Sequence, residues 1–235
     1  MLWYLYGHSR PDLGFALSQV ARFTFCTKRS HELALIRIGQ YLNGTKDKGL
    51  IMKPMNLDQF HMEVFVDADF LGLYGKEKRT DPDNVKSRAG YIIFINGCPV
   101  IWASKLIPTV MLSTMMSEYY ACSMAMREAL PLRDLTKAIA EGCGLNTALK
   151  TTFKTTVWED NMGALTLANL DPGHNTTQSK HYDSKVHWFR SYLSKDGPNP
   201  ITVEKIDTKV QCGDLYTKCL LKDAFERLRK LIMGW

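Results

Sequence analysis

The spacing of hydrophobic residues changes at residue 60, and this change constrains the possible folds more than any other feature of the chain. From Phe60 to Asp69, apolar residues recur at every second position, which is the period of a β-strand with one face in the core. Near the end of this strand, the other face carries two carboxylates, Asp67 and Asp69. We therefore expect a sheet with acidic side chains at the end of one of its strands.

Two further strands and a series of alternating elements follow this first strand. The apolar segments 90–95 and 99–104 are separated by Asn96-Gly97, a dipeptide typical of tight hairpin turns. From residue 60 the predicted order is β-β-β-α-β-α-α-β-α, which indicates a mixed sheet with helices on its faces. The later elements are expected as a helix over 117–140 that Pro131 splits or kinks, a strand over 151–158, helices over 161–169 and 179–193, a strand over 200–206 and a helix over 214–235.

The first 45 residues have the pattern of a helical hairpin. Pro11 opens a helical spacing of apolar residues that fades near Cys26. Ser30 can cap a second helix, which Gly44 ends. Residues 54–58 then read as a linker, so we expect an N-terminal helical hairpin ahead of the sheet.

Charge is distributed unevenly along the chain. The 235 residues include 30 Lys and Arg against 24 Asp and Glu, and residues 1–55 alone hold eight basic and three acidic side chains. A basic segment of this kind suits a polyanion, because phosphate contacts release counterions. An ordinary solvated helix surface would explain the same charges, so both interpretations remain open. The hydrophobic content of 45% excludes a disordered chain.

Cysteine spacing and apolar runs bear on the cellular compartment. None of the six cysteines forms a Cys-x-x-Cys pair, which argues against a zinc knuckle and favours reduced thiols. No apolar run approaches the roughly 20 residues that span a bilayer, and the first residues lack a signal-peptide core. We expect an intracellular protein without a membrane partner, in the cytoplasm or in virus-like particles.

Four acids stand at the ends of predicted elements: Asp67, Glu118, Asp160 and Asp214. Like charges brought within a few ångströms repel each other unless a cation lies between them. Mg²⁺ prefers hard oxygen ligands, and two such ions can stabilise both the attacking and the leaving oxygen at a phosphodiester. The pattern is compatible with one shared metal site, and four unrelated surface acids remain the alternative at this point.

Motifs along the whole chain resemble one family, the ribonuclease H domain of copia-type (Ty1/copia) retrotransposon polyproteins, preceded by the end of their reverse transcriptase. The stretches that carry the resemblance to the reverse transcriptase end are Ser9–Ser18 with Arg22-Phe23, and His31–Thr45 with Gly49-Leu50. Those that resemble the ribonuclease H domain are Val66-Asp-Ala-Asp-Phe70, Lys86-Ser87 with Gly90-Tyr91, Ile101-Trp-Ala-Ser-Lys105, Leu112–Tyr119, Glu159-Asp-Asn161, Ser179-Lys-His181 with His187-Trp-Phe189, and Gly213-Asp-Leu-Tyr-Thr-Lys218.

The resemblance implies a specific fold and domain division. It implies a ribonuclease H-like α/β fold, with a mixed five-stranded sheet flanked by helices, over residues 55–235. Residues 1–54 would be a helical remnant of the reverse transcriptase, similar to its thumb and connection. The chain has no Tyr-x-Asp-Asp turn, so we expect no polymerase active site and no DNA synthesis.

The resemblance also implies an activity, which is hydrolysis of the RNA strand of RNA–DNA hybrids by a two-metal endonuclease. The family's four catalytic, metal-binding acids fall on Asp67, Glu118, Asp160 and Asp214, with two Mg²⁺ ions, or Mn²⁺, as cofactor. The expected partners are the hybrid and the polymerase part of the same polyprotein. Candidate contacts to phosphate or the 2′-OH are Ser104, Lys105, Asn161 and His181.

Two other functions remain to be weighed. Met115-Met116 stands where the family has Thr-Glu, and Phe70 replaces its Trp, so an inactive remnant that only binds nucleic acid is the main alternative. A transposase or integrase relative would carry its acids in the order Asp, Asp, Glu with about 35 residues between the last two. The order here is Asp, Glu, Asp, Asp, which disfavours that group.

Overall fold

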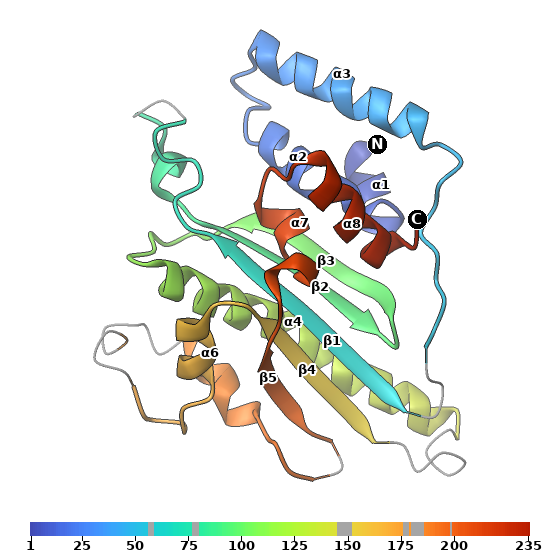
Figure 1. Ribbon diagram of the computed structural model, residues 1–235, viewed down its shortest axis with the longest axis vertical. Coiled ribbons are helices and arrows are strands. Elements are labelled where there is room, and N and C mark those ends of the chain that lie inside the picture. The colour runs from blue at the N-terminus through green and yellow to red at the C-terminus, as the bar shows by residue number, and fades with distance from the viewer. Residues whose placement is uncertain (56–58, 77–79, 145–151, 176–178, 180–185, 198) are drawn as a thin grey trace.

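The computed structural model describes residues 1–55, 59–76, 80–144, 152–175, 179, 186–197 and 199–235, and a five-stranded mixed sheet forms its centre (Figure 1). The strand order is β3-β2-β1-β4-β5. The first three strands pair antiparallel, and β4 and β5 add parallel to β1. The strands are β1 (Phe60–Asp69), β2 (Arg88–Ile95), β3 (Cys98–Leu106), β4 (Phe153–Glu159) and β5 (Ile201–Lys205). The expected ribonuclease H-like mixed sheet with flanking helices is thus confirmed.

The central strand β1 follows the period of two that the sequence indicates. Met62, Val64 and Val66 are fully buried in the first of two hydrophobic cores. The hairpin turn between β2 and β3 also forms as expected, with positive φ at Asn96 and Gly97. Both residue types tolerate this left-handed conformation, which matches the twist of the flanking strands.

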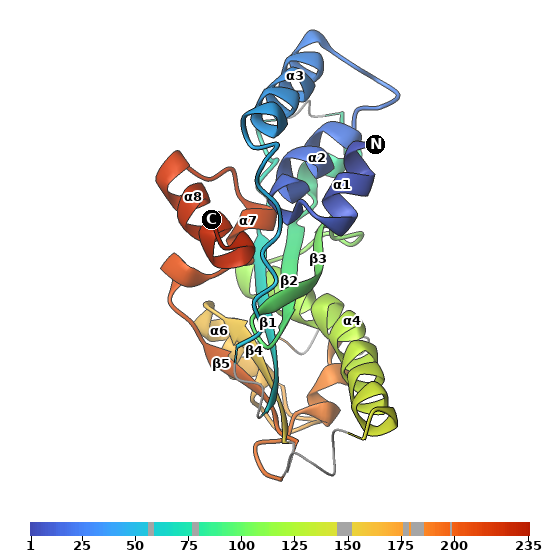
Figure 2. The ribbon, with the colours of Figure 1, turned by 90° about the vertical axis from the view of Figure 1, so that its right-hand side faces the viewer.

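Helices cover the sheet on both faces, as Figure 2 shows with the sheet seen nearly edge-on. The long helix α4 (Thr114–Gly142) packs against β1 and β2 on one face. The short helix α7 (Asp214–Thr217) and the amphipathic α8 (Lys222–Met233) lie on the other face. The remaining helical segments are α1 (Leu2–His8), η1 (Pro11–Leu13), α2 (Gly14–Ala21), α3 (Arg29–Gly44), η2 (Pro82–Val85), α6 (Met162–Ala168), η4 (Trp188–Tyr192) and η5 (Thr208–Val210).

The second hydrophobic core joins the two ends of the chain. It combines Leu17 of α2 and Ile38 of α3 with Ile92 of β2 and with Leu228 and Ile232 of α8. The predicted N-terminal hairpin therefore packs into the same body as the sheet. The boundary between domains 1–54 and 55–235 stays a prediction.

A buried ion pair fixes the N-terminal segment in this core. Arg10 donates from Nε and Nη2 to both oxygens of Asp12, at 3.0 and 2.7 Å. The Tyr41 hydroxyl of α3 donates to Asp12 at 2.6 Å, and Thr45 accepts from Arg10. Arg229 of α8 donates to the same tyrosine oxygen, so the network connects both ends of the chain.

Three helical predictions differ from the structure. Pro131 lies within α4 without splitting it, because the proline is exposed and solvent can satisfy the carbonyl that it leaves free. The helix expected over 214–235 is divided into α7 and α8. The helix expected over 179–193 falls partly on residues 180–185, which lie outside the described residues, and its described end is the 3₁₀ segment η4.

Helix α1 was not expected from the sequence, because it lies before Pro11, where we predicted that the first helix begins. In the described parts of the chain, no helix combines the length and apolar character needed to cross a bilayer.

Candidate metal centre

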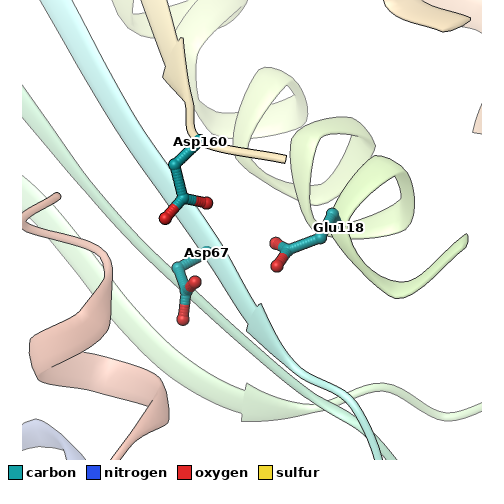
Figure 3. Close-up of side chains that lie close together, drawn as sticks. All are labelled: Asp67, Glu118 and Asp160. Atoms are coloured by element: carbon teal, nitrogen blue, oxygen red, sulfur yellow. The ribbon is translucent and has the colours of Figure 1, made fainter. Parts of the chain in front are cut away.

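Three of the four predicted acids meet at one edge of the sheet (Figure 3). Asp67, Glu118 and Asp160 each offer a carboxylate oxygen, and these oxygens all lie within 4.8 Å of one another. Figure 3 shows the Glu118 side chain pointing from α4 toward the other two carboxylates. This is the separation that ligands around one shared cation would need.

Strand pairing explains why residues 93 positions apart come together. In the parallel pair of β1 and β4, Phe65 lies opposite Trp158. Asp67 and Asp160 each stand two residues further along, so both reach the same edge of the sheet. Glu118 arrives from the first turns of α4, whose start is capped by the Ser113 side chain accepting a hydrogen bond from the Met116 amide.

The burial of Glu118 gives the site an unsatisfied acceptor. Glu118 is 4% exposed, and in the described part of the chain its Oε2 atom is buried without a hydrogen-bond partner. Burial, together with the smaller effect of the nearby charges of Asp67, Glu159 and Asp160, raises the pKa of Glu118 to about 11. The ionised form of this carboxylate is unfavourable in the free protein, and a hard cation beside it would stabilise that form. The donor set consists of oxygens, so it fits Mg²⁺ or Mn²⁺.

Asp214 lies beside this group and contacts it through a lysine. Lys218 Nζ is 2.9 Å from Asp67 Oδ1 and 2.7 Å from Asp214 Oδ1. Burial raises the pKa of Asp214 to about 7, with a further contribution from Asp67, although Lys218 opposes the shift. Burial alone would lower the pKa of Lys218, but the attraction of the two carboxylates outweighs it and the pKa lies above its usual value.

Helix α7 and the residue directly after it bring Asp214, Thr217 and Lys218 to the site. Asp214 is the first residue of α7 and Thr217 its last, and Lys218 is the C-cap residue that follows. The Thr217 hydroxyl donates to Asp67 Oδ2. Thr217 and Lys218 belong to a motif of the sequence, but their roles could not be predicted from it, because Asp67 lies far away in the chain.

Two glycines allow α7 to approach the sheet this closely. A Cβ atom at Gly213 would lie 2.8 Å from the Asp67 backbone nitrogen. A Cβ atom at Gly90 of β2 would lie 2.6 Å from the Thr217 side chain and 3.0 Å from the Gly213 carbonyl. Both contacts are too close for a side chain, so the two glycines set the distance between Thr217 and Asp67.

A further buried acid, Glu159, stands behind the three carboxylates. It is fully buried at the end of β4, where it accepts hydrogen bonds from the Cys122 thiol and the Asn161 amide. Burial raises the pKa of Glu159 to about 8. Sequence reasoning did not single it out, although its position next to Asp160 at a strand end was a usable signal.

The predicted substrate contacts occupy different positions. Ser104 is buried, and its hydroxyl donates to the Tyr216 carbonyl and accepts from Arg88. Asn161 caps α6, with its Oδ1 accepting from the backbone amides of residues 163 and 164 at 2.9 and 3.0 Å. Lys105 is exposed. His181 lies outside the described residues. The roles of all four toward a substrate stay predictions.

The sheet order and the three convergent carboxylates define an α/β protein of ribonuclease H type with a candidate metal centre. The chain is 29% identical over 231 residues, 98% of its length, to the retrovirus-related Pol polyprotein from transposon TNT 1-94 of Nicotiana tabacum. It is 27% identical over 226 residues to the Pol polyprotein from transposon RE1 of Arabidopsis thaliana, with 95% of the chain covered. The homologues of the chain are thus copia-type retrotransposon Pol polyproteins.

Other comparisons define the extent of this relationship. The chain spans 16% and 14% of the lengths of these two polyproteins. It is also 32% identical over 136 residues, 58% of its own length, to Secreted RxLR effector protein 161 of Plasmopara viticola, covering 89% of that protein. No protein-family model matches the chain. Among solved structures, it is similar to the N-terminal RNase H domain of Rv2228c from Mycobacterium tuberculosis, with 13% identity, 72% and 96% of the two chains covered and a TM-score of 0.38.

Proposed function

We propose that this chain hydrolyses the RNA strand of RNA–DNA hybrids, as the ribonuclease H part of a retrotransposon reverse transcriptase. The main support is the meeting of Asp67, Glu118 and Asp160 within 4.8 Å in a chain whose homologues are retrotransposon Pol polyproteins. Asp214 joins the set through its contact with Lys218. These four acids are the proposed catalytic and metal-binding residues.

The chain's own residues would prepare the site for divalent cations. Asp67, Glu118 and Asp160 would hold a first ion, with Asp67 and Asp214 beside the position of a second. Bound Mg²⁺ or Mn²⁺ would neutralise the clustered carboxylates and stabilise the attacking and leaving oxygens of a phosphodiester. Thr217 orients Asp67 by its hydrogen bond, and Glu118 Oε2 is left free to accept a ligand. Glu118 would release its proton as a cation arrives, because the positive charge favours the ionised form.

The proposed substrate is an A-like RNA–DNA heteroduplex bound by its backbone. Such recognition reads helix shape and the 2′-OH, so cleavage would not depend on sequence. Lys105 is exposed and available for phosphate contact, and Asn161 stands next to Asp160. The basic residues 1–55 would contribute counterion release, and the polymerase part of a polyprotein would be the protein partner.

One observation favours a second candidate, an inactive remnant that binds nucleic acid. Glu159 places an additional buried carboxyl beside Asp160. An additional acid makes the site more costly to ionise and can weaken metal binding or catalysis. In this case the chain would bind hybrids without cleaving them.

A hybrid-cleavage assay with Mg²⁺ separates the two candidates. We expect the wild-type chain to degrade the RNA strand of a labelled hybrid. Asp67→Asn, Glu118→Gln and Asp160→Asn should each reduce the rate by more than about 100-fold, beyond the 10–100-fold typical of residues behind the ligands. Glu128→Gln, on the exposed face of the same helix as Glu118, is the matched control and should cleave normally.

Two results would contradict the proposal in different ways. Cleavage that survives Asp67→Asn or Asp160→Asn would refute the assigned roles. A gel shift with hybrid but no turnover in Mg²⁺ or Mn²⁺ would select the inactive remnant.

A further inference from the structure

Lys218 occupies a position in this site that the proposed chemistry does not explain. Its ammonium group lies between two acids, 2.9 Å from Asp67 Oδ1 and 2.7 Å from Asp214 Oδ1. The Asp67 side chain is fully buried and that of Asp214 is 9% exposed. Two buried carboxylates side by side need a positive charge between them, and in this structure the lysine supplies it.

Both oxygens of Asp67 are engaged by residues of the same short segment. Thr217 donates to Oδ2 and Lys218 donates to Oδ1. The side of the site between Asp67 and Asp214 is therefore closed by the protein's own donors.

The opposite side of the site differs. Glu118 Oε2 is buried and has no hydrogen-bond partner among the residues that the structure describes. Asp160 is half-buried, and its Oδ2 accepts only a neutral donor in the described part of the chain, the Thr208 hydroxyl at 2.8 Å. On one side of the site the Lys218 ammonium group balances the acids. On the other side, within the described residues, Glu118 and Asp160 have no hydrogen bond from a charged donor.

We propose that Lys218 occupies the second cation position in the nucleic-acid-free protein. One divalent ion binds on the side of Glu118 and Asp160, and a second binds only after the ammonium group has left Asp67 and Asp214. This inference rests on the proposed use of divalent cations. Lys218 acts as a positioning residue, since it controls access to two acids.

The physical basis is competition for the same oxygens. An ammonium nitrogen at 2.7–2.9 Å from two carboxylate oxygens fills the space in which a Mg²⁺ ion would sit at roughly 2.0–2.1 Å from its ligands. Lysine and a divalent ion also repel each other at this separation. The Lys218 side chain is 37% exposed and is carried on a flexible stem, so it has a route out of the site.

The test counts bound metal without any nucleic acid. Free Mn²⁺ is measured by electron paramagnetic resonance while the full chain is titrated. We expect one Mn²⁺ per wild-type chain in the tight phase and two per Lys218→Met chain, with the second affinity increased at least about 10-fold. Methionine retains an unbranched stem without the charge. Lys222→Met, an exposed lysine at the start of α8, is the matched control and should bind one ion.

Thermal unfolding supplies a second measurement. Without metal, Lys218→Met should melt below the Lys222→Met control, because Asp67 and Asp214 lose their counter-charge. Saturating Mn²⁺ should raise its melting temperature more than it raises that of wild type. Lys218→Arg retains the charge and should remain at one tightly bound Mn²⁺, even if the methionine variant fails to fold.

Several outcomes would overturn the inference. These are two equally tight Mn²⁺ ions in wild type, no tight Mn²⁺ in wild type, or a single ion in a folded Lys218→Met chain. A chain that cleaves hybrids but binds two tight ions would refute this inference alone. A chain with the expected stoichiometry that never cleaves would retain the inference and refute hydrolysis.

Discussion

The Thr217 hydroxyl donates a hydrogen bond to the Asp67 carboxylate, although the two residues lie 150 positions apart in the chain. Thr217 belongs to α7, which packs on the face of the sheet opposite α4. Asp67 belongs to the central strand and also approaches Glu118 of α4. Through this bond the last quarter of the chain sets the orientation of an acid near the middle of the first half.

Removing this donor should loosen the metal centre without unfolding the protein. Thr217→Val keeps the shape of the side chain but leaves Asp67 Oδ2 without its hydroxyl partner. We expect Mn²⁺ affinity and the rate of hybrid cleavage to fall about 10–100-fold, as for other residues that orient metal ligands. Thr166→Val on α6, an exposed threonine that bonds within its own helix, should change neither quantity. Unchanged affinity in a folded Thr217→Val chain would refute the orienting role.

The close approach of α7 to the sheet can be tested with a single methyl group. In Gly213→Ala the added carbon would meet the Asp67 backbone nitrogen at 2.8 Å, so either α7 or β1 must move. We expect a lower melting temperature and weaker Mn²⁺ binding. Gly39→Ala in α3 adds the same group where nothing lies within 4 Å, and should stabilise the protein by about 0.5–1 kcal/mol. Two alanine variants with equal stability would contradict this account.

The buried acids predict how the stability of the metal-free protein depends on pH. Burial raises the pKa values of Glu118, Glu159 and Asp214, to about 11, 8 and 7. These groups bind protons in the folded state that the unfolded chain releases above about pH 4–5. Their favourable contribution is therefore complete at low pH and is lost as pH rises, by up to about 1.4 kcal/mol per pH unit for each such group. In EDTA, the melting temperature should fall by several degrees between pH 5 and pH 8.

A neutral isostere identifies the source of this slope. Glu118→Gln removes one of the titrating groups, so its melting temperature in EDTA should fall less steeply with pH than that of wild type. Glu128→Gln on the exposed side of α4 should retain the wild-type slope. Added Mg²⁺ should raise the wild-type melting temperature most at pH 8, because a bound cation favours the ionised carboxylates. A melting temperature that rises from pH 5 to pH 8 in EDTA would refute the assignment.

The buried ion pair of Arg10 and Asp12, which Tyr41 links to the C-terminal helix α8, should matter for stability. The side chains of Arg10 and Asp12 are 6% and 0% exposed, so Asp12→Asn leaves a buried guanidinium without its counter-charge. We expect the free energy of unfolding to fall by about 3–5 kcal/mol in urea denaturation. Breaking the exposed pair of Arg29 and Glu32 by Glu32→Gln should change it by less than about 0.5 kcal/mol. Similar losses in both variants would refute the structural importance of the buried pair.

Local sequence patterns were sufficient to predict most of the helices and strands, since each of these elements depends on residues that are close together in the chain. The period of two predicted β1, Asn96-Gly97 predicted the hairpin of β2 and β3, and Gly44 predicted the end of α3. The cap expected at Ser30 was wrong, because α3 begins at Arg29 with Lys28 as its N-cap. The division of the last helix into α7 and α8 was not evident, because helical residues continue through the break. The sequence also predicted a split or kink at Pro131, but α4 is not split there, because Pro131 is exposed and solvent can satisfy the carbonyl that it leaves free.

The sequence by itself determined that Asp67 and Asp160 stand at strand ends and that Glu118 stands near the start of a helix, because these positions follow from local periodicity. The helix begins at Thr114, so Glu118 lies one turn further into it than the predicted start at residue 117 implied. Only the tertiary structure decided which groups face them. Lys218 lies between Asp67 and Asp214 because Gly90 and Gly213 let α7 come into backbone contact with the sheet. The same close approach lets the Ser104 hydroxyl donate to the Tyr216 carbonyl, while Arg88 reaches Ser104 from the neighbouring strand β2. Contacts between residues so far apart depend on how whole elements pack, and no local pattern encodes that distance.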